Sequence, residues 1–485
     1  YQRAGHRQEV IENTPGRQMV KYIANTFFKF DNINIIAHNA GYDLRVGLFP
    51  YLYNYEGIEN GSQFILGSAN IYPSAPSAKA FLKKRNVNNI PVKIKCSYKM
   101  TDMKLNKFGK VFGLSQHKEY MPYKLYSTKN IELRYIDYED CLKEVKEKDR
   151  ELFLENVSKW KLMKDNKIDI IGYSREYCKL DVIVLQQGYE KFREQIKEIS
   201  GKVLDKEIKE DCPDLFVDIY NHYTISSVAN EMLLIGGCYK RTYEFSGVVR
   251  EFIQECVVGG RVMTRSNEKV NIPYEKKLVG KKQYLHKYIY DVDATSLYPS
   301  ALFRIPGFIE GVPKVLPDMS GYTDRKQIID ILNTMTNDSH YFLEINISRV
   351  GISRNFPLLS YKSDGIRFWT NDVIGSEDEP IPMYCDRTML EDWIEFHDID
   401  FKIVRGYYFV DGYNPKINAT MKWLFEERVK QKKLGNPIQN SIKLLMNSGY
   451  GKTLEKAHED TILYKTEKEK DAYIRKKYNF IKEMT

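Results

Sequence analysis

The sequence predicts a protein of several domains that combines α/β with α+β architecture. Its 485 residues are enough for about three domains. In the first third, short apolar runs alternate with helical patterns, and from Val249 onward strands and turns predominate. A helical pattern returns near the C-terminus as two adjacent helices. An α/β part, a strand-rich part and a helical hairpin account for these observations.

The composition is typical of an ordered globular protein. Hydrophobic residues make up 42% and charged residues 29%, as in ordered globular proteins, and the net charge of +9 permits a polyanionic partner. No stretch approaches the ~18 uninterrupted apolar residues of a membrane span, which predicts no membrane partner. The seven cysteines include no CxxC pair. This usage indicates an intracellular, reducing compartment, either host cytoplasm or mitochondrion, without structural zinc.

One strand and one long helix are predicted in the N-terminal half. Residues 33–38 (INIIAH) are typical of a buried strand that ends in the polar turn 39–41. A helical pattern extends from about 174 to 200. Residues 201–250 have a mixed pattern, which we interpret as a connection between domains.

The C-terminal half is predicted to contain half-buried strands at Tyr288–Val292 and His340–Val350, where apolar and polar residues alternate. Residues 417–451 have the pattern of a helical hairpin. Asn436 is placed to cap its second helix, and Pro437 occupies the first helical position, where a missing N–H costs nothing.

The segment from Asp293 to Ser300 (DATSLYPS) is the strongest candidate for chemistry. A predicted strand carries Asp293 at its carboxyl end, before a tight turn and a helix that starts at Pro299. A carboxylate fixed there is a suitable oxygen ligand for Mg²⁺, which binds few protein carboxylates together with substrate phosphates. Asp291 could serve instead. The alternative is that Asp293 only caps the turn or the helix.

A second candidate lies on the predicted hairpin. Lys443, Asn447 and Tyr450 share one helix face, and an ammonium, an amide and a phenol suit the triphosphate, sugar and base of a nucleotide. Arg428 and Lys432, four residues apart on the preceding helix, could add positive charge there. The alternative is a solvated basic face.

A third candidate lies in the first 200 residues. Asp43 follows the strand 33–38 at the start of a helix, and Tyr177 and Asp181 share a helix face. Two carboxylates and a tyrosine could hold metal ions and orient a water for phosphodiester hydrolysis. Alternatively, Asp43 is a partner of the helix dipole and the other two are surface residues.

Taken together, the second half of the chain resembles the family B DNA polymerases. DxxSLYPS and KxxxNSxYG occur in the order of that family's motifs A and B, 150 residues apart at positions 293 and 443. The resemblance implies that Asp293 is a catalytic metal ligand, assisted by the Ala294 carbonyl. It also implies nucleotide contacts from Lys443, Asn447, Tyr298 and Tyr450, with Arg428 and Lys432 nearby.

The N-terminal residues then resemble the Exo II and Exo III motifs of a 3′→5′ proofreading exonuclease with an RNase H-like fold. This implies that Asp43, Asp181 and Tyr177 are catalytic, with the two aspartates as metal ligands. Asn39 and Tyr42 would contact DNA.

Weaker features resemble the protein-primed branch of the family. Lys118-Glu-Tyr-Met resembles its Kx2h motif, whose lysine assists exonuclease catalysis. Ser97 occupies the position of its single-strand contact. Gly259 and Gly260 resemble its YxGG motif, which contacts DNA, although Val257 replaces the tyrosine. Implied partners are template and primer DNA, dNTPs and a terminal protein, with Mg²⁺ as cofactor and Mn²⁺ as a substitute. The implied domains are an exonuclease (1–200), a connecting region (201–262), a palm with a terminal-protein-region insertion (263–416), short helical fingers (417–451) and an incomplete return to the palm (452–485).

Two motifs of the family are missing. No apolar strand with an Asp-x-Glu pair precedes Asn39, and no Asp-Thr-Asp hairpin follows Gly451. The sequence therefore predicts a fragment that is inactive on its own, because two-metal transfer needs more carboxylates than Asp293 supplies. The alternatives are a family B polymerase that uses RNA or DNA primers, and an inactive integrated relic that only binds DNA.

Overall fold

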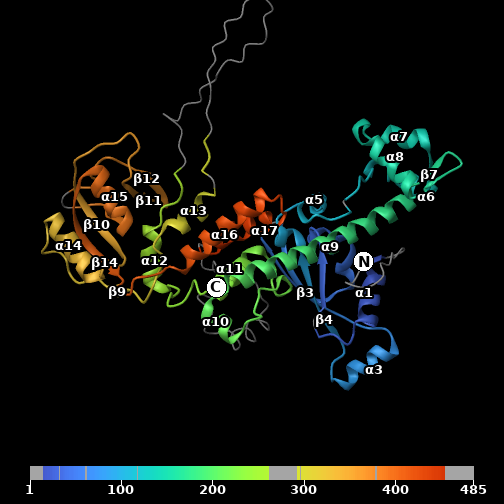
Figure 1. Cartoon of the computed structure of the whole chain (residues 1–485), viewed down its shortest axis with the longest axis horizontal. Coiled ribbons are helices and arrows are strands. Elements are labelled where there is room, and N and C mark those ends of the chain that lie inside the picture. The colour runs from blue at the N-terminus through green and yellow to red at the C-terminus, as the bar shows by residue number, and fades with distance from the viewer. Residues whose placement is uncertain are drawn as a thin grey trace, which may run out of the picture.

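The computed structural model describes residues 15–453, apart from 32, 61–62, 117, 262–291, 295 and 377–378. Figure 1 shows an elongated molecule, with a sheet domain at one end, helices in the middle and a second sheet with its helices at the other end. Most of the strand predicted at 288–292, together with Asp291, lies outside the described residues. Within the described part of the chain, no helix combines the length and apolarity needed to cross a bilayer.

The N-terminal domain (15–203) is built on a four-stranded sheet in the order β1-β4-β3-β2, in which β1 and β4 are parallel and the other pairs antiparallel. The strand predicted at 33–38 is confirmed as β1. A buried apolar core lies between the sheet and α1. The elements are α1 (Pro15–Thr26), β1 (Ile33–Ala37), α2 (Ala40–Asp43), β2 (Tyr53–Asn60), β3 (Gln63–Ile71), α3 (Pro76–Lys84), β4 (Ile90–Cys96), α4 (Ser97–Thr101) and α5 (Phe108–Phe112).

A long helix, α9 (Ile170–Val203), crosses this domain and is longer than the pattern at 174–200 predicted. The side chain of Asp169 accepts a hydrogen bond from the Gly172 amide at 2.8 Å, so it caps the first turn. A small subdomain with its own core sits at the N-terminal end of α9 (Figure 1). It contains α6 (Thr128–Leu133), β5 (Tyr135–Asp137), α7 (Tyr138–Glu144), α8 (Arg150–Lys159), β6 (Met163–Lys164) and β7 (Lys167–Asp169).

Residues 201–250 are more than the connection predicted from their mixed pattern. They contain α10 (Lys206–Asp211) and α11 (Ile225–Ile235), and α12 (Gly247–Cys256) begins within them. Apolar side chains on α11 recur at helical spacing and are buried, at positions 225, 228, 229, 232 and 233. This part of the chain is therefore core, because α11 packs against α9 and the C-terminal helices.

The predicted helical hairpin is confirmed as α16 (Lys416–Lys433) and α17 (Ile438–Thr453). Gly435 has a φ of 66°. The Asn436 amide donates to the Gln431 carbonyl at 2.9 Å, which ends α16 in a Schellman turn. The Asn436 side-chain oxygen accepts from the Ile438 amide at 3.1 Å, as predicted for a cap.

The hairpin and the N-terminal domain share one hydrophobic core. Phe108 and Phe192 belong to the same buried cluster as Ile442 and Leu445 of α17. A buried hydrogen bond also joins α17 to α9, from the Ser441 hydroxyl to the Gln195 side-chain oxygen at 2.7 Å. The predicted boundaries at 200 and 417 therefore do not separate independent cores.

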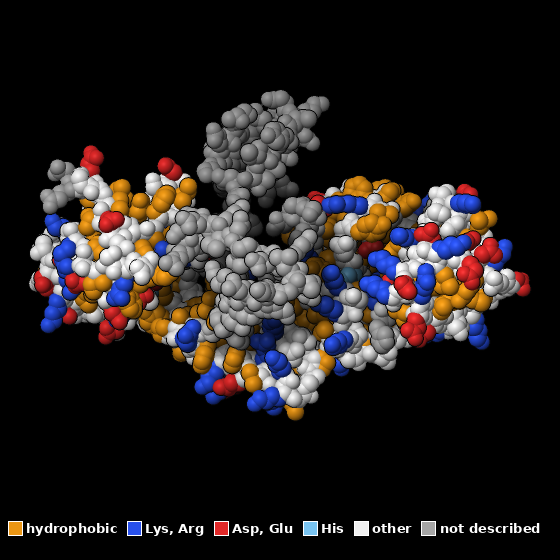
Figure 2. Space-filling view, turned by 90° about the horizontal axis from the view of Figure 1, so that it is seen from above, with side chains coloured by type: hydrophobic (Ala, Val, Ile, Leu, Met, Phe, Trp, Pro, Cys, Tyr) orange, Lys and Arg blue, Asp and Glu red, His pale blue; other side chains and the backbone are white. Residues whose placement is uncertain are grey.

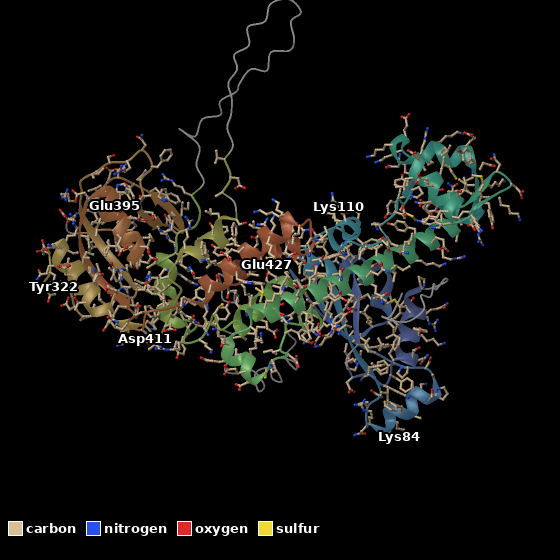
Figure 3. The ribbon with its side chains drawn as sticks, in the orientation of Figure 1. Lys84, Lys110, Tyr322, Glu395, Asp411 and Glu427 are labelled. Atoms are coloured by element: carbon tan, nitrogen blue, oxygen red, sulfur yellow. The ribbon has the colours of Figure 1, made fainter. Side chains whose placement is uncertain are left out.

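The sheet domain (308–414) lies at the opposite end of the molecule, where Tyr322 and Glu395 are labelled in Figure 3. Its antiparallel sheet has the order β13-β10-β14-β9 and its own core. The strand predicted at 340–350 is confirmed as β10. The elements, with α13 before them, are α13 (Leu297–Arg304), β8 (Phe308–Ile309), β9 (Lys314–Val315), α14 (Arg325–Thr336), β10 (Tyr341–Val350), β11 (Ser360–Ser363), β12 (Ile366–Trp369), β13 (Met383–Asp386), α15 (Arg387–His397), β14 (Ile399–Tyr408) and β15 (Tyr413–Asn414).

Candidate functional site

A cavity of about 1310 Å³ lies at the carboxyl end of β1, between α1 and α9. The structure brings five polar residues from four segments together on its wall, although up to 143 positions separate them. His38 and Asn39 directly follow β1, and loop residues at the end of a strand can point their side chains into a pocket. The five are His38, Asn39, Asp43, Lys118 and Asp181.

Lys118 and Asp181 form an ion pair in this cavity. The Lys118 Nζ lies 2.5 Å from Asp181 Oδ2 and 4.8 Å from the centre of the Tyr177 ring. Burial, and then the charge of Asp181, raises the pKa of Tyr177, so its phenol keeps its proton at neutral pH. Asp181 Oδ1 is buried and makes no hydrogen bond within the described residues.

His38 is a site residue that sequence reasoning missed. Its Nδ1 lies 3.0 Å from the Ser97 hydroxyl, which donates to the Ala37 carbonyl at 3.2 Å. This arrangement assigns the ring proton to Nδ1. Burial, and then the charge of Lys118, lowers the pKa of His38 to about 4, so the ring is neutral at pH 7. Its position directly after an apolar strand was the available signal.

Ser97 itself is fully buried, which differs from the predicted role in contacting a single strand. Its hydroxyl is used inside the protein, where it holds His38. The neighbouring Tyr98 lines the cavity instead, with its ring edge-on to His38 at 5.7 Å between centres.

Asn39 makes the turn between β1 and α2 with a φ of 65°, a left-handed conformation that asparagine tolerates better than most residues. The turn places Asp43 on the cavity wall, where burial raises the pKa of its carboxyl. Tyr42 is 67% exposed and is not among the lining residues. Two of the three predicted Exo II residues therefore line the same cavity as Asp181, and Tyr42 faces solvent.

The second candidate site is at the turn before α13. Asp293 and Ala294 are exposed there. The helix starts at Leu297, two residues before Pro299, which corrects the prediction that proline begins it. Proline in the first turn is tolerated, because the N–H groups of that turn have no partner within the helix.

The structure brings this turn into contact with the helical hairpin. The rings of Tyr298 and Tyr450 are stacked, 4.1 Å between centres and 9° between planes. Arg428 Nη1 lies 3.3 Å from the Ser296 hydroxyl, which ties α16 to the same turn. Aromatic stacking and a cationic hydrogen bond therefore join segments more than 130 positions apart.

The other predicted nucleotide-binding residues lie on the same hairpin. Lys443 and Asn447 are exposed on α17, while Leu445 and Met446 on its other side are buried. The Lys432 side chain is exposed on α16 and makes no hydrogen bond or ion pair with the rest of the described structure. The same holds for the side chains of Lys443 and Asn447.

Donors for a metal ion are present but incomplete. The cavity offers Asp43 and the unpaired oxygen of Asp181, and the turn offers Asp293 with the Ala294 carbonyl. Such oxygen donors suit Mg²⁺. Across residues 15–453, less the gaps given above, no group of three or more His, Cys, Asp or Glu is placed to hold a metal. A two-ion site therefore needs further ligands.

Gly259 and Gly260 are exposed, and a Cβ atom at either position would meet no neighbouring atom. The protein's own packing therefore does not demand glycine here. The segment before them is fixed, because Arg367 on β12 donates to the Val257 carbonyl at 3.3 Å. Arg261, directly after them, donates to the Pro357 carbonyl at 2.7 Å.

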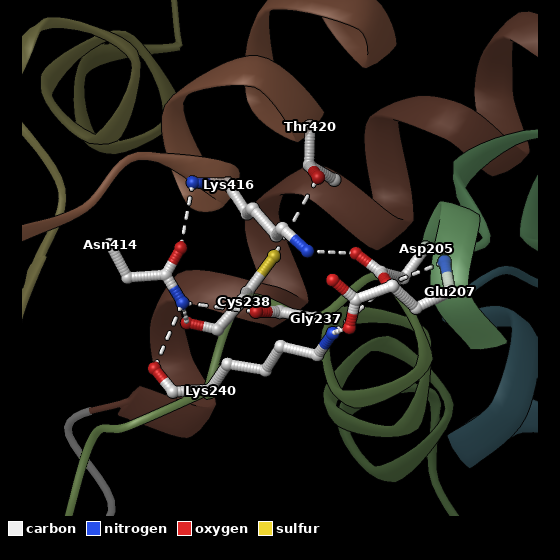
Figure 4. Close-up of polar contacts among 8 residues, drawn as sticks. All are labelled: Asp205, Glu207, Gly237, Cys238, Lys240, Asn414, Lys416 and Thr420. Atoms are coloured by element: carbon white, nitrogen blue, oxygen red, sulfur yellow. Dashed lines mark hydrogen bonds and ion pairs between the residues drawn. The ribbon is translucent and has the colours of Figure 1, made fainter.

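A buried carboxylate forms ion pairs at the start of the helical hairpin. Asp205 receives the ammonium groups of Lys416 and Lys240, the latter at 3.1 Å, and its side chain is only 4% exposed (Figure 4). Burial raises the pKa of Asp205, but hydrogen bonds from the two lysines outweigh it and bring the pKa to about 2. Asn414 adds three hydrogen bonds to the carbonyls of Gly237, Cys238 and Lys240. These residues, Asp205, Lys240, Asn414 and Lys416, are called the hairpin joint below.

A family model and solved structures relate this chain to known proteins. A family model described as DNA polymerase type B, organellar and viral, matches residues 24–484. No curated protein sequence matches the chain. Phi29 DNA polymerase complexed with primer-template DNA and incoming nucleotide substrates is similar in structure at 14% identity and a TM-score of 0.46, over 86% of this chain and 59% of that one. Phi29 DNA polymerase complexed with single-stranded DNA is similar at 14% identity and a TM-score of 0.43, over 90% and 60%. The chain therefore spans about three fifths of the length of these polymerases.

Proposed function

Because the chain belongs to the organellar and viral type B DNA polymerases, we propose that it is the central part of a DNA-directed DNA polymerase with an attached 3′→5′ proofreading exonuclease. The observation that carries this proposal is the contact between the two polymerase motifs, in which Tyr298 stacks on Tyr450 and Arg428 reaches Ser296. In this assignment residues 417–451 are the fingers and the turn at Asp293 belongs to the palm.

At the proposed polymerase site, the chain's own residues would bind and orient the incoming nucleotide. Lys443 and Arg428 place positive charge where a triphosphate would lie, and Asn447 offers an amide beside them. The Tyr298–Tyr450 pair presents aromatic faces to the sugar and the base. Mg²⁺, or Mn²⁺ in its place, would neutralise the phosphate charge from the side of Asp293. Positioning and charge neutralisation supply most of the rate in such reactions.

In the proposed exonuclease, hydrogen-bonding groups of fixed protonation come from His38 on the cavity wall and from Tyr177, which contacts the wall residue Lys118. The neutral Tyr177 phenol is a donor, and the Nε2 of neutral His38 is an acceptor. Lys118 holds one oxygen of Asp181 and leaves the other unpaired. These groups are suited to orient a water against a phosphodiester, with Asp43 as the second carboxylate.

The free edge of β1 supports an RNase H-like nuclease. Among the described strands, β1 pairs only with β4, and residues 33–37 of its other edge line the cavity. Apolar side chains of α1 and α9 form the walls, including Ile23 and Leu185. An added strand would find backbone partners along this edge and would end beside Asp43 and Asp181. We expect the missing Asp-x-Glu pair on such a strand.

The experiment uses one substitution in each site, so that each variant controls for the other. Primer extension and 3′→5′ degradation are measured with Mg²⁺ on the intact gene product that contains this chain. Asp293→Asn should reduce extension more than about 10²-fold and leave degradation unchanged, whereas Asp181→Asn should do the reverse. Loss of both activities in either variant would contradict two separate sites.

The 485-residue chain alone is expected to be inactive in both reactions, because its described donors are too few for two ions. Extension of a primer by this chain, abolished by Asp293→Ala, would show this expectation to be wrong. If the intact product binds DNA but carries out neither reaction, the alternative of an inactive relic holds.

We further propose that the intact polymerase is protein-primed. Its support is the placement of Lys118 of the Kx2h-like segment against Asp181 and the short hairpin of fingers. Initiation with a terminal-protein hydroxyl is expected, and initiation only from RNA or DNA primers would favour the alternative family B enzyme.

A further inference from the structure

The segment between Asp102 and Glu119 contains no acidic residue but has four lysines, of which Lys104, Lys107 and Lys110 are spaced three apart. The chain there forms a 3₁₀ turn (Leu105–Lys107) that continues into α5. Lys107 and Lys110 are about one turn apart at the start of α5, and Lys104 lies in an extended conformation directly before the 3₁₀ turn. These three lysines are called the basic row.

The basic row is exposed and unpaired, whereas the opposite face of the same segment is buried. Leu105, Phe108 and Phe112 on that face enter the shared core. None of the three ammonium groups has an ion pair or hydrogen bond among the residues that the structure describes. Some surface lysines elsewhere have an acidic partner, such as Lys143 with Asp140 at 2.7 Å. The row thus lies in a segment that has lysines and no acidic residue, whereas Figure 2 shows both signs of charge on both ends of the molecule.

The basic row lies between the nuclease cavity and the fingers. Lys104 lines the mouth of the nuclease cavity. Lys110 lies on α5, which contacts α17 of the fingers, and Figure 3 shows it at the upper edge beside that hairpin. The row therefore leads from the cavity toward the fingers.

We propose that the basic row binds the phosphate backbone of single-stranded DNA outside the nuclease cavity and guides the strand between the cavity and the fingers. A row of cations beside a cavity with an exposed aromatic residue, Tyr98, is the arrangement that suits a single strand without sequence preference. This inference rests on the proposed function, because it takes the cavity to be the nuclease site.

The test measures the salt dependence of single-strand binding by the 485-residue chain, with a fluorescent oligothymidylate and EDTA to prevent cleavage. The variant replaces Lys104, Lys107 and Lys110 with Gln. Each lost phosphate contact lowers the slope of log K against log salt by about 0.7, so the triple variant should lose about 2.

The matched control replaces Lys79, Lys83 and Lys84 of α3 with Gln, which removes the same charge. These lysines are also exposed, and Figure 3 shows Lys84 at the far end of the domain from Lys110. The control should keep the wild-type slope. Because all six side chains are exposed, both variants should keep the wild-type melting temperature.

Three results would overturn the inference. The first is an equal slope in the triple variant and wild type, which leaves the proposed function intact. The second is competition by polyglutamate as effective as that by unlabelled oligothymidylate, which would point to an acidic peptide. The third is no binding of DNA by the wild-type chain, which would count against the proposed function as well.

Discussion

Removal of the charge on Asp205 should destabilise the protein by an amount that depends on pH. A pKa of about 2, against about 3.9 for an unperturbed aspartate, corresponds to about 2.5 kcal/mol at neutral pH. The side chains of Lys240 and Lys416 are each 38% exposed, so solvent screens part of this attraction. We therefore expect Asp205→Asn to lower the free energy of unfolding by about 1.5 kcal/mol at pH 7.

The sign of the pH dependence follows from the lowered pKa of Asp205. The stabilisation is fully present above the pKa of the unfolded chain and is lost as the pH falls through about 4 toward 2. The difference between wild type and Asp205→Asn should therefore shrink to about half by pH 3. Urea unfolding at pH 7 and pH 3, with midpoints and slopes from intrinsic fluorescence, measures it.

The control is Glu207→Gln, which removes the other carboxylate that contacts Lys240. The Glu207 side chain is 80% exposed, so its loss should change the unfolding free energy by less than about 0.5 kcal/mol. The reasoning fails if Asp205→Asn is as stable as this control at pH 7. A difference that stays constant down to pH 3 would also refute it, since it would then arise from packing and not from charge.

Two further predictions concern histidines. NMR titration should give His38 a pKa of about 4, and Lys118→Met should raise it, because the cation disfavours protonation; an unchanged pKa would contradict the effect attributed to the Lys118 charge. Since folded His38 binds fewer protons than the unfolded chain between pH 4 and 6.5, its contribution makes stability rise with pH in that range. In the sheet domain, buried His397 accepts from the Leu358 amide at 2.9 Å and contacts the Ile352 carbonyl at 3.0 Å, so His397→Phe should cost about 2–3 kcal/mol by leaving both unpaired. A urea midpoint equal to that of wild type would show that water replaces these bonds.

Local chemistry made several elements predictable. The β1 strand and the turn at Gly435-Asn436-Pro437 are each determined by a few neighbouring residues, and the structure contains both. The exposed face of Lys443 and Asn447 also followed from helical spacing alone. Where a structure is set by neighbours in sequence, one chain is enough to predict it.

Long-range pairing was harder to predict. The role of α11 as core was missed, because its apolar period becomes decisive only when α9 and α17 cover it. Asp205 carried no signal, since its partner Lys416 is 211 positions away. His38 was overlooked for the same reason: its surroundings come from Ser97 and Lys118, which no local pattern connects to it.

The core that the helical hairpin shares with the N-terminal domain has a consequence for the two proposed sites. Helix α17 carries Lys443 and Asn447, and it packs on α9, which carries Tyr177 and Asp181. Leu445 is buried in the core that these helices share, so a substitution there would displace the residues of both proposed sites. Under the proposed function, one core substitution would therefore affect two activities, although it touches neither site directly.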